Sequence, residues 1–193
     1  MSAKLTITIP EWLDKICAWP VVVYRKHKYG IPFRRIYLGE EKWTIVEPKD
    51  YYKLIKYNWC PGTNSGLTYA FRIISKPGKK LRIQSMHREI MKPPKDLLVD
   101  HRFGNTLDNR RANLRIATRS QNNCNRRIDK SKCSSRYYGV YYEKQKRKWI
   151  ARINYKGKRL RLGNFDNEID AAKAYDAAAK KYHGEFARLN FQD

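Results

Sequence analysis

The stretch "VDHRFGNTLDNRRANLRIATRSQNN", residues 99–123, decides the fold around an Asp-His step. The short apolar runs "LLVD" and "LRIAT" predict two strands, and the Gly-, Asn- and Asp-rich "RFGNTLDNRRAN" between them predicts a loop, in which Asn105 and Asn109 are expected to form turns. "RSQNNCNRRI" then predicts a helix capped by Thr118 or Ser120. The stretch therefore predicts strand, loop, strand and helix in immediate succession.

The residue types in this stretch suit the hydrolysis of a phosphodiester, which needs a base for the attacking water and a cation for the developing charge. Neighbours in a strand point to opposite faces, so Asp100 and His101 can serve one phosphate only where the chain bends, and a glycine three residues later permits the bend. His101 is the candidate base and Asn113 the candidate group that orients its imidazole. Asp100 and the amide oxygen of Asn122 are candidate ligands of a hard cation such as Mg²⁺.

The overall charge points to a polyanionic partner. The chain has 193 residues and a formal net charge of +24, so nucleic acid is the expected partner and an anionic membrane surface is the rival. No apolar run reaches the ~18 residues of a membrane-spanning helix, and the N-terminus shows no signal-peptide pattern. The four cysteines have no zinc-type spacing, which predicts reduced thiols.

The basic charge is segregated within the C-terminal part of the chain. Residues 126–161 hold 14 Lys and Arg against two acidic residues, a net charge of +12, whereas residues 162–193 have a net charge of −2. A merely solubilising surface mixes the two signs. The segregation therefore predicts one face that lies on phosphates.

The same C-terminal part predicts a three-stranded sheet packed on one helix. "YYGVYYEKQ", "KWIARINYKG" and "KRLRLGNF" are three consecutive strands, and "NEIDAAKAYDAAAKKYHG" is a helix capped by Asn167. Alternation along the strands places Ile150, Arg152 and Asn154 on the sheet face away from the helix, together with Arg159 and Arg161. The helix presents an apolar stripe to the other face, made of Ala171, Ala172, Tyr175, Ala178, Ala179 and Tyr182.

The N-terminal half gives weaker patterns. Trp12, Ile16 and Trp19 have helical spacing, and Pro20 is expected to stop that helix. "RRIYLG" and "KWTIVE" predict strands, followed by a helix with Pro48 in its first turn. "LTYAFRIIS" and "KLRIQSMHREIM" predict a hairpin joined by a Pro-Gly turn.

From Met86 to Arg126 the sequence resembles the HNH motif of homing endonucleases, a ββα-metal nuclease. The resemblance rests on "SMHREIMKPPKDLL" and on the stretch quoted first. It implies His101 as general base, Asn113 as the residue that orients it, and Asp100 and Asn122 as ligands of one Mg²⁺ or Mn²⁺ ion per active site. The family usually has Asp-Gly or Asn-Gly after the histidine, where this chain has Phe103-Gly104.

From Tyr138 to Phe191 the sequence is similar to the DNA-binding domain of the ethylene-response-factor or APETALA type, most specifically in "LGNFDNEIDAAKAYDAAA" and "ARLNF". That family lays its sheet in the DNA major groove. The resemblance implies DNA contacts by five residues, Tyr141, Arg152, Asn154, Arg159 and Arg161. Tyr138, Tyr141, Arg152 and Arg161 stand where plant members usually carry Arg, Arg, Glu and Trp, so the plant target sequence is not expected here.

Together these observations predict an α+β chain: a ββα-metal HNH nuclease module plus a three-stranded antiparallel sheet on one helix. The expected divisions are an extension at 1–30, a nuclease module at 31–126, a linker at 127–136 and a DNA-binding domain at 137–193. The expected function is site-specific DNA cleavage by a homing endonuclease of a phage or bacterial mobile element. The alternatives are a DNA-binding regulator with the nuclease module as scaffold, and an RNA-binding accessory protein.

The expected partner is double-stranded DNA, with no membrane, and the expected state is a monomer or a transient dimer on DNA. The expected location is the cytoplasm of a prokaryotic or phage-infected cell, in association with DNA.

Overall fold

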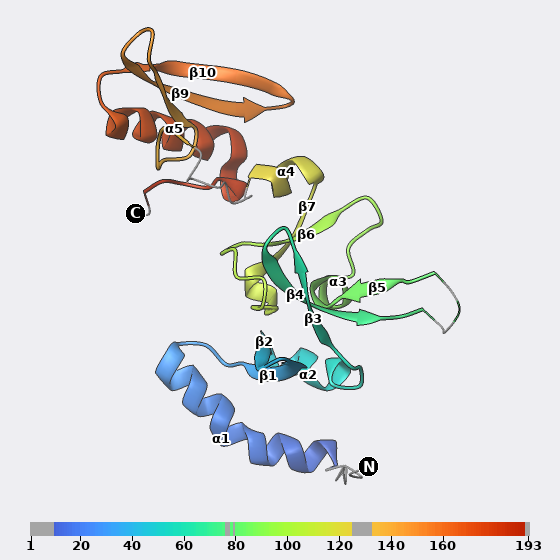
Figure 1. The fold of residues 1–193 in the computed structure, drawn as a ribbon. Helices are drawn as coiled ribbons and strands as arrows, with labels where there is room; N and C mark the ends of the chain where they lie inside the picture. The colour runs from blue at the N-terminus through green and yellow to red at the C-terminus, as the bar shows by residue number, and fades with distance from the viewer. Residues whose placement is uncertain (1–9, 76–77, 79, 125–132, 192–193) are drawn as a thin grey trace. The chain divides into compact units, whose positions relative to one another are not determined.

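The computed structural model of the chain describes residues 10–75, 78, 80–124 and 133–191. The chain forms two compact units that interleave along the sequence: unit 1 is Met1–Pro93 with Phe103–Ile116, and unit 2 is Pro94–Arg102 with Ala117–Asp193. Small antiparallel sheets and helices make up both units, which confirms the predicted α+β class (Figure 1).

Unit 1 begins with the helix α1 (Glu11–Tyr29), which runs through Pro20 and ends at Gly30 in the left-handed conformation. The predicted stop at Pro20 is therefore wrong. Proline lacks the N–H that would bond to the carbonyl of Ile16, so the helix continues with one backbone hydrogen bond fewer. No helix among the described residues is long and apolar enough to cross a membrane.

The next elements of unit 1 are a hairpin and a short helix, as predicted. β1 (Arg34–Gly39) pairs antiparallel with β2 (Lys42–Val46), and buried Ile36 lies opposite buried Thr44. α2 (Pro48–Leu54) follows, with its proline in the first turn, where the missing N–H costs no helical hydrogen bond.

The second sheet of unit 1 has β4 (Leu67–Ile73) between β3 (Cys60–Asn64) and β5 (Ile83–Ser85), all antiparallel. The predicted hairpin between β4 and β5 is confirmed, whereas its second strand ends at Ser85 and continues as the helix α3 (Met86–Met91). Met86 and Ile90 are both buried, and a spacing of four residues places them on one helix face. Pro77 of the predicted turn lies outside the described residues.

The motif region has the predicted order of strand, loop, strand and helix. Its elements are β6 (Leu98–His101), the short 3-10 helix η1 (Arg111–Asn113), β7 (Leu114–Ala117) and α4 (Arg119–Cys124). β6 and α4 belong to unit 2, and the loop from Phe103 onward belongs to unit 1.

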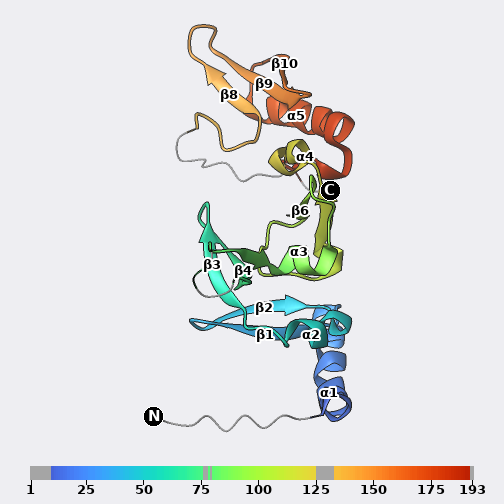
Figure 2. The same cartoon turned by 90° about the vertical axis from the view of Figure 1, so that its right-hand side faces the viewer.

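The rest of unit 2 is the predicted sheet and helix (Figures 1 and 2). The strands are β8 (Val140–Glu143), β9 (Lys148–Tyr155) and β10 (Lys158–Phe165), with β9 in the middle, and α5 (Glu168–His183) lies on one face. The short 3-10 helix η3 (Gly184–Phe186) follows α5. Asn167 caps α5 by accepting from the Asp170 N–H at 2.8 Å, as predicted.

The core of this domain depends on small residues. Ala151 of the sheet and Ala171 and Ala172 of the helix are completely buried, which lets α5 approach the strands closely. Gly139 has a φ of +70°, and a Cβ there would lie 2.0 Å from the Tyr175 ring. Glycine is therefore required where the chain enters β8.

The predicted boundaries of the modules stay predictions. Residues 127–132 of the predicted linker lie outside the described residues. Ser135, at the other end of that linker, is buried and donates its hydroxyl hydrogen to Glu168 of α5 at 2.7 Å.

Candidate active site and nucleic-acid interface

Asp100 and His101 are the last two residues of β6, and both are buried, with 7% and 5% of their surface exposed. The strand ends at His101, and Gly104 follows with a φ of +70°, a conformation that favours glycine. The bend predicted after the Asp-His step is therefore present.

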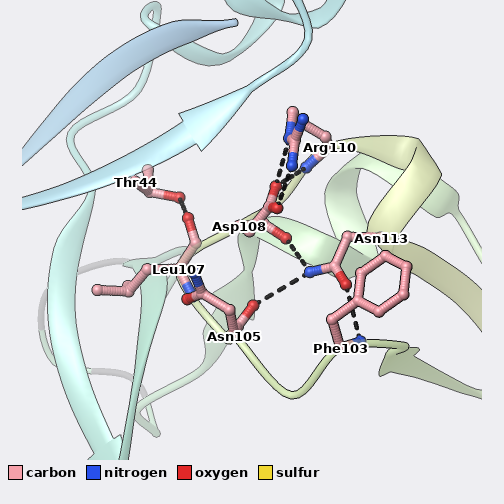
Figure 3. Close-up of polar contacts among 7 residues, drawn as sticks. All are labelled: Thr44, Phe103, Asn105, Leu107, Asp108, Arg110 and Asn113. Carbon is pink, nitrogen blue, oxygen red and sulfur yellow. Dashed lines mark hydrogen bonds and ion pairs between the residues drawn. The ribbon is translucent and has the colours of Figure 1, made fainter. Parts of the chain in front are cut away.

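Asn113 is 1% exposed, and its amide group holds the loop that leaves β6 (Figure 3). Its Nδ2 donates to the carbonyls of Asn105 at 3.2 Å and Asp108 at 2.8 Å, and its Oδ1 accepts from the Phe103 N–H at 3.0 Å. Asn113 thus makes three hydrogen bonds to the backbone of the loop. Its predicted role in orienting His101 stays a prediction.

The other polar residues of the loop bind it to β2 of the same unit. Thr44 donates its hydroxyl hydrogen to the Leu107 carbonyl at 2.7 Å and accepts from Asn109 Nδ2 at 2.8 Å. Asn105 Oδ1 accepts from the Leu107 N–H at 3.2 Å, which confirms it as a turn former. Asn109 is only 1% exposed, and its hydrogen bond to Thr44 connects the loop to β2. The prediction that Asn109 is a simple turn residue is therefore wrong.

Two arginines complete the network around the loop. Arg110 makes paired hydrogen bonds to Asp108, and the hydrogen bond with this carboxylate raises the pKa of the guanidinium, against the effect of burial. Arg111 binds both oxygens of buried Asp50 in α2, at 2.8 and 2.9 Å. The sequence did not reveal Thr44 and Asp50 as partners of the loop, because no local pattern indicates a partner so far away in the chain. Thr44 is 63 residues from Leu107, and Asp50 is 61 residues from Arg111.

Asn122 lies on α4, which packs against β6 within unit 2. Thr118 accepts from the Gln121 N–H at 3.3 Å, and Gln121 Oε1 accepts from the Thr118 N–H at 2.8 Å. This reciprocal capping box starts the helix and decides the cap in favour of Thr118. Unit 2 thus brings together the elements that hold Asp100, His101 and Asn122, whereas Asn113 belongs to unit 1.

The donor set fits a hard divalent cation. Asp100 would supply a carboxylate and Asn122 an amide oxygen, the ligand types that such a cation prefers. No group of three or more His, Cys, Asp or Glu side chains within the described residues is placed to hold a metal. Such a cation would therefore take most of its ligands from water and from phosphate oxygens, as Mg²⁺ commonly does.

The five predicted DNA-contacting residues lie on neighbouring strands of one sheet. Arg159 is opposite Asn154, and Arg161 is opposite Arg152, so each pair projects from the same face. Arg152 also lies over the Tyr141 ring, 4.6 Å from its centroid. The structure therefore brings the predicted set together on one face.

This face is less open than the strand alternation predicted. Ile150 is completely buried, so the open basic part of the face begins at Arg152, whereas Arg159 and Arg161 are exposed. Arg161 is held by Asn164 and, at 3.2 Å, by Glu143. Hydrogen bonds from Lys146 and Arg161 in turn lower the pKa of Glu143, so this carboxylate keeps its charge beside the arginine.

Comparisons with known proteins agree with this geometry. A family model described as HNH endonuclease matches residues 92–124. An uncharacterized HNH endonuclease of Acanthamoeba polyphaga mimivirus is 31% identical over 166 residues, which cover 80% of this chain and 73% of the viral protein. No solved structure gives a significant match.

The C-terminal part has its own relatives in plants. The dehydration-responsive element-binding protein 2A of Oryza sativa is 48% identical over 48 residues, 24% of this chain. An AP2-like ethylene-responsive transcription factor of Arabidopsis thaliana is 44% identical over 66 residues, 34% of this chain. The chain spans only 18% and 13% of the length of these two plant proteins.

The motif, the fold and these relatives define a nuclease with an attached DNA-binding domain, and DNA is its partner. The chain belongs to the HNH endonuclease family, and its C-terminal part is an AP2-like domain. HNH nucleases generally use a divalent metal ion.

Proposed function

We propose that this protein is a site-specific DNA endonuclease of the homing type, from a phage or bacterial mobile element, that hydrolyses phosphodiester bonds with one Mg²⁺ or Mn²⁺ ion per active site. The observation that supports it best is the burial of an adjacent carboxylate and imidazole at the end of β6, against the helix that holds Asn122. An adjacent carboxylate and imidazole at the end of a strand, followed by a glycine bend, supply the ligand and base types that phosphodiester hydrolysis needs.

In this proposal His101 accepts the proton of the water that attacks the phosphorus. Asp100 and Asn122 would hold the divalent ion, which when bound supplies positive charge at the leaving oxygen. Asn113 would hold the loop that follows His101 in the chain, Phe103–Asn113, in one conformation while DNA binds.

The AP2-like domain would bring the nuclease site to its target. Exposed Arg159 and Arg161 on β10 can fork onto guanine or bind phosphates, and Asn154 adds an amide that can pair with adenine. The module boundaries at residues 30, 126 and 137 belong to this proposal. So do its action as a monomer or transient dimer on DNA and its location with DNA in the cytoplasm of a prokaryotic or phage-infected cell.

A plasmid-nicking assay with and without EDTA tests the nuclease part. We expect the parent protein to nick supercoiled DNA with Mg²⁺ or Mn²⁺ only. His101→Ala should lose at least about 100-fold in rate, because general bases contribute on that order. Gel-shift binding should stay within a few-fold, and added imidazole should restore part of the rate.

The matched control is His27→Ala, which removes an exposed histidine of α1 and should leave nicking unchanged. A His101→Ala protein that cuts as fast as the parent would exclude His101 as the base. A parent protein that binds DNA and never cuts it would favour the DNA-binding regulator.

The salt dependence of DNA binding tests the sheet. Arg159→Ala with Arg161→Ala should weaken binding and lower the slope of log K against log salt by up to ~1.8, because each phosphate contact contributes about 0.9. Lys173→Ala with Lys181→Ala removes the same charge from exposed positions of α5, on the other side of the sheet, and should leave the slope nearly unchanged. An unchanged slope in the Arg159→Ala, Arg161→Ala variant would show that this face of the sheet does not contact the DNA phosphates.

A further inference from the structure

α1 exposes a stripe of large apolar side chains that no described residue covers. Trp12, Ile16, Trp19 and Val23 are 64%, 63%, 66% and 41% exposed, and none of the helix's residues is buried. At 100° per residue these four side chains fall within an arc of about 60°. An apolar stripe of this size on a helix marks an interaction surface rather than scattered surface residues.

The helix is attached to its own unit through a different side. Asp14, Ala18, Val22 and Arg25 are its half-buried residues. Asp14 accepts from Arg34 and from the Tyr52 hydroxyl, at 3.0 and 2.8 Å, and Arg25 donates to the Phe33 carbonyl at 3.0 Å. Figures 1 and 2 show α1 at the edge of unit 1, beside β1 and α2. The stripe therefore stays open while the helix is firmly docked.

We propose that this stripe is a self-association surface, on which α1 of a second copy of the chain packs antiparallel around a two-fold axis. A two-fold interface uses the same patch on both partners, so one self-complementary stripe is sufficient. The stripe is centred between Ala18 and Cys17, so antiparallel packing sets Trp12 near the partner's Val23 and Ile16 near the partner's Trp19.

The charges beside the stripe favour the antiparallel direction. The acidic residues of α1 lie in its first turn and the basic ones in its last turn. Glu11 and Lys26 flank the stripe on the same side, so antiparallel packing brings Glu11 of one copy near Lys26 of the other. Parallel packing would set the acidic first turns of the two copies at the same end, and likewise their basic last turns. Glu11 now pairs with Lys15, but both side chains are more than half exposed and can exchange partners at little cost.

The area available fits a weak dimer. A tryptophan can bury roughly 150–250 Å², of which about two thirds is still exposed here. Four tryptophans, with the neighbouring Ile16, Val23, Leu13 and Tyr24 of both copies, reach a total on the order of 1,000 Å², the size of a transient complex. The formal charge of +24 on each copy opposes association in solution, so salt should strengthen this dimer by screening, whereas salt weakens DNA binding.

Sedimentation velocity of the full chain across the micromolar range, at low and physiological salt, tests the association. The parent should show a monomer–dimer equilibrium that salt strengthens. Trp19→Glu and Trp12→Glu should each weaken the dimer by about 30-fold or more, the effect of losing a buried aromatic anchor. These side chains are exposed, so far-UV circular dichroism should stay unchanged.

The matched control is Lys28→Gln, which changes the charge by the same one unit on the same exposed helix, ~160° away from Trp12. It should leave the dimer intact. A protein that stays monomeric at every concentration and salt, or a dimer that the tryptophan variants do not weaken, would overturn the proposal. Tryptophan-dependent binding to phosphatidylserine vesicles by a monomeric protein would assign the stripe to a lipid surface instead.

Cysteine cross-linking tests the direction of packing in a background with all four cysteines, Cys17, Cys60, Cys124 and Cys133, changed to serine. With a rise of 1.5 Å per residue, antiparallel packing sets the two copies of position 16 about 4–5 Å apart along the axis and the two copies of position 12 about 16 Å apart. Ile16→Cys should therefore form a disulfide-linked dimer and Trp12→Cys should not. Efficient cross-linking of both variants would indicate parallel packing and overturn the antiparallel arrangement.

The association measurements do not depend on DNA cleavage, so they can fail or succeed independently of the nuclease proposal. A two-fold dimer would carry two copies of the HNH site, one for each strand of a duplex. This consequence alone rests on the proposed function.

Discussion

The loop Phe103–Asn113 and the AP2-like domain are held together in opposite ways. The loop depends on single polar atoms: Asn113, Asn109 and Thr44 are buried and bond to backbone or to one another. The domain depends on area and fit, with completely buried alanines between α5 and the sheet. A loop fixed by hydrogen bonds keeps one conformation beside a reacting group, whereas an apolar core mainly provides a stable platform.

The largest effect should come from Asn113→Asp, which keeps the shape of the side chain and removes its two N–H donors. A carboxylate would then face the carbonyl oxygens of Asn105 and Asp108, which currently accept from the amide. We expect unfolding to become easier by about 2–4 kcal/mol, the cost of buried groups left unsatisfied. Nicking should fall by about 100-fold, since small misplacements near a reacting centre cost that much.

The control is Asn105→Asp on the same loop. Asn105 is exposed, and it uses only its side-chain oxygen, as acceptor from the Leu107 N–H, which a carboxylate can replace. Urea unfolding and nicking rates should both stay close to those of the parent. If Asn113→Asp changed stability and nicking as little as this control does, the loop would not depend on individual polar atoms. The contrast between the loop and the apolar core of the AP2-like domain would then be wrong.

A smaller effect is expected from Asp176→Asn, which challenges the description of the domain as purely apolar. Asp176 is buried in α5 and accepts from the backbone N–H groups of Asn190 and Phe191, both at 2.9 Å. Asparagine in its place replaces one carboxylate oxygen by an NH2 group, which cannot accept these hydrogen bonds, and leaves the remaining oxygen uncharged. We expect a loss of about 1.5–3 kcal/mol in the free energy of unfolding, the range for hydrogen bonds to a charged group.

Urea denaturation detects this change, and Asp166→Asn serves as the control, because the Asp166 side chain is 89% exposed. Equal midpoints for the two variants would mean that the apolar core alone holds the C-terminal segment in place. A larger loss for Asp176→Asn would show that the domain also contains one polar clamp of the kind that fixes the loop.

The smallest effect on the free energy of unfolding should come from Asp14→Asn, which tests a partly exposed polar contact against the buried ones. Burial raises the pKa of Asp14, but hydrogen bonds from Tyr52 and Arg34 outweigh it, so its pKa lies below the ordinary value. A carboxyl with a depressed folded-state pKa stabilises the fold above its unfolded pKa of about 4, and this contribution is lost as the pH falls through the folded-state pKa.

Because Asp14 is partly solvent-exposed, its contribution at pH 7 should be only about 0.5 kcal/mol. The stability difference between the parent and Asp14→Asn, measured by urea unfolding, should be present at pH 7 and shrink toward zero below about pH 4. A difference that grows in acid would have the wrong sign for a depressed pKa.

The sequence by itself determined the local elements and the chemistry that they carry. The strand, loop, strand and helix around His101, the three strands and the helix of the C-terminal domain, and the Asn167 cap all follow from period, turn residues and capping pairs, which act over a few residues. The types of the candidate site residues follow in the same way, because hydrolysis of a phosphodiester needs an imidazole, a carboxylate and hard oxygen ligands.

Only the tertiary structure decided which of these residues support one another. In the folded chain the Asn113 amide bonds to the loop backbone, and Arg111 pairs with Asp50 of α2. Asn109, predicted as a turn residue, makes a buried contact with Thr44. The tertiary structure also continued α1 through Pro20 and buried Ile150 on a face predicted to be open. The physical reason is the same throughout: partners about 60 residues apart leave no local pattern, and burial depends on neighbours that only the folded chain brings together.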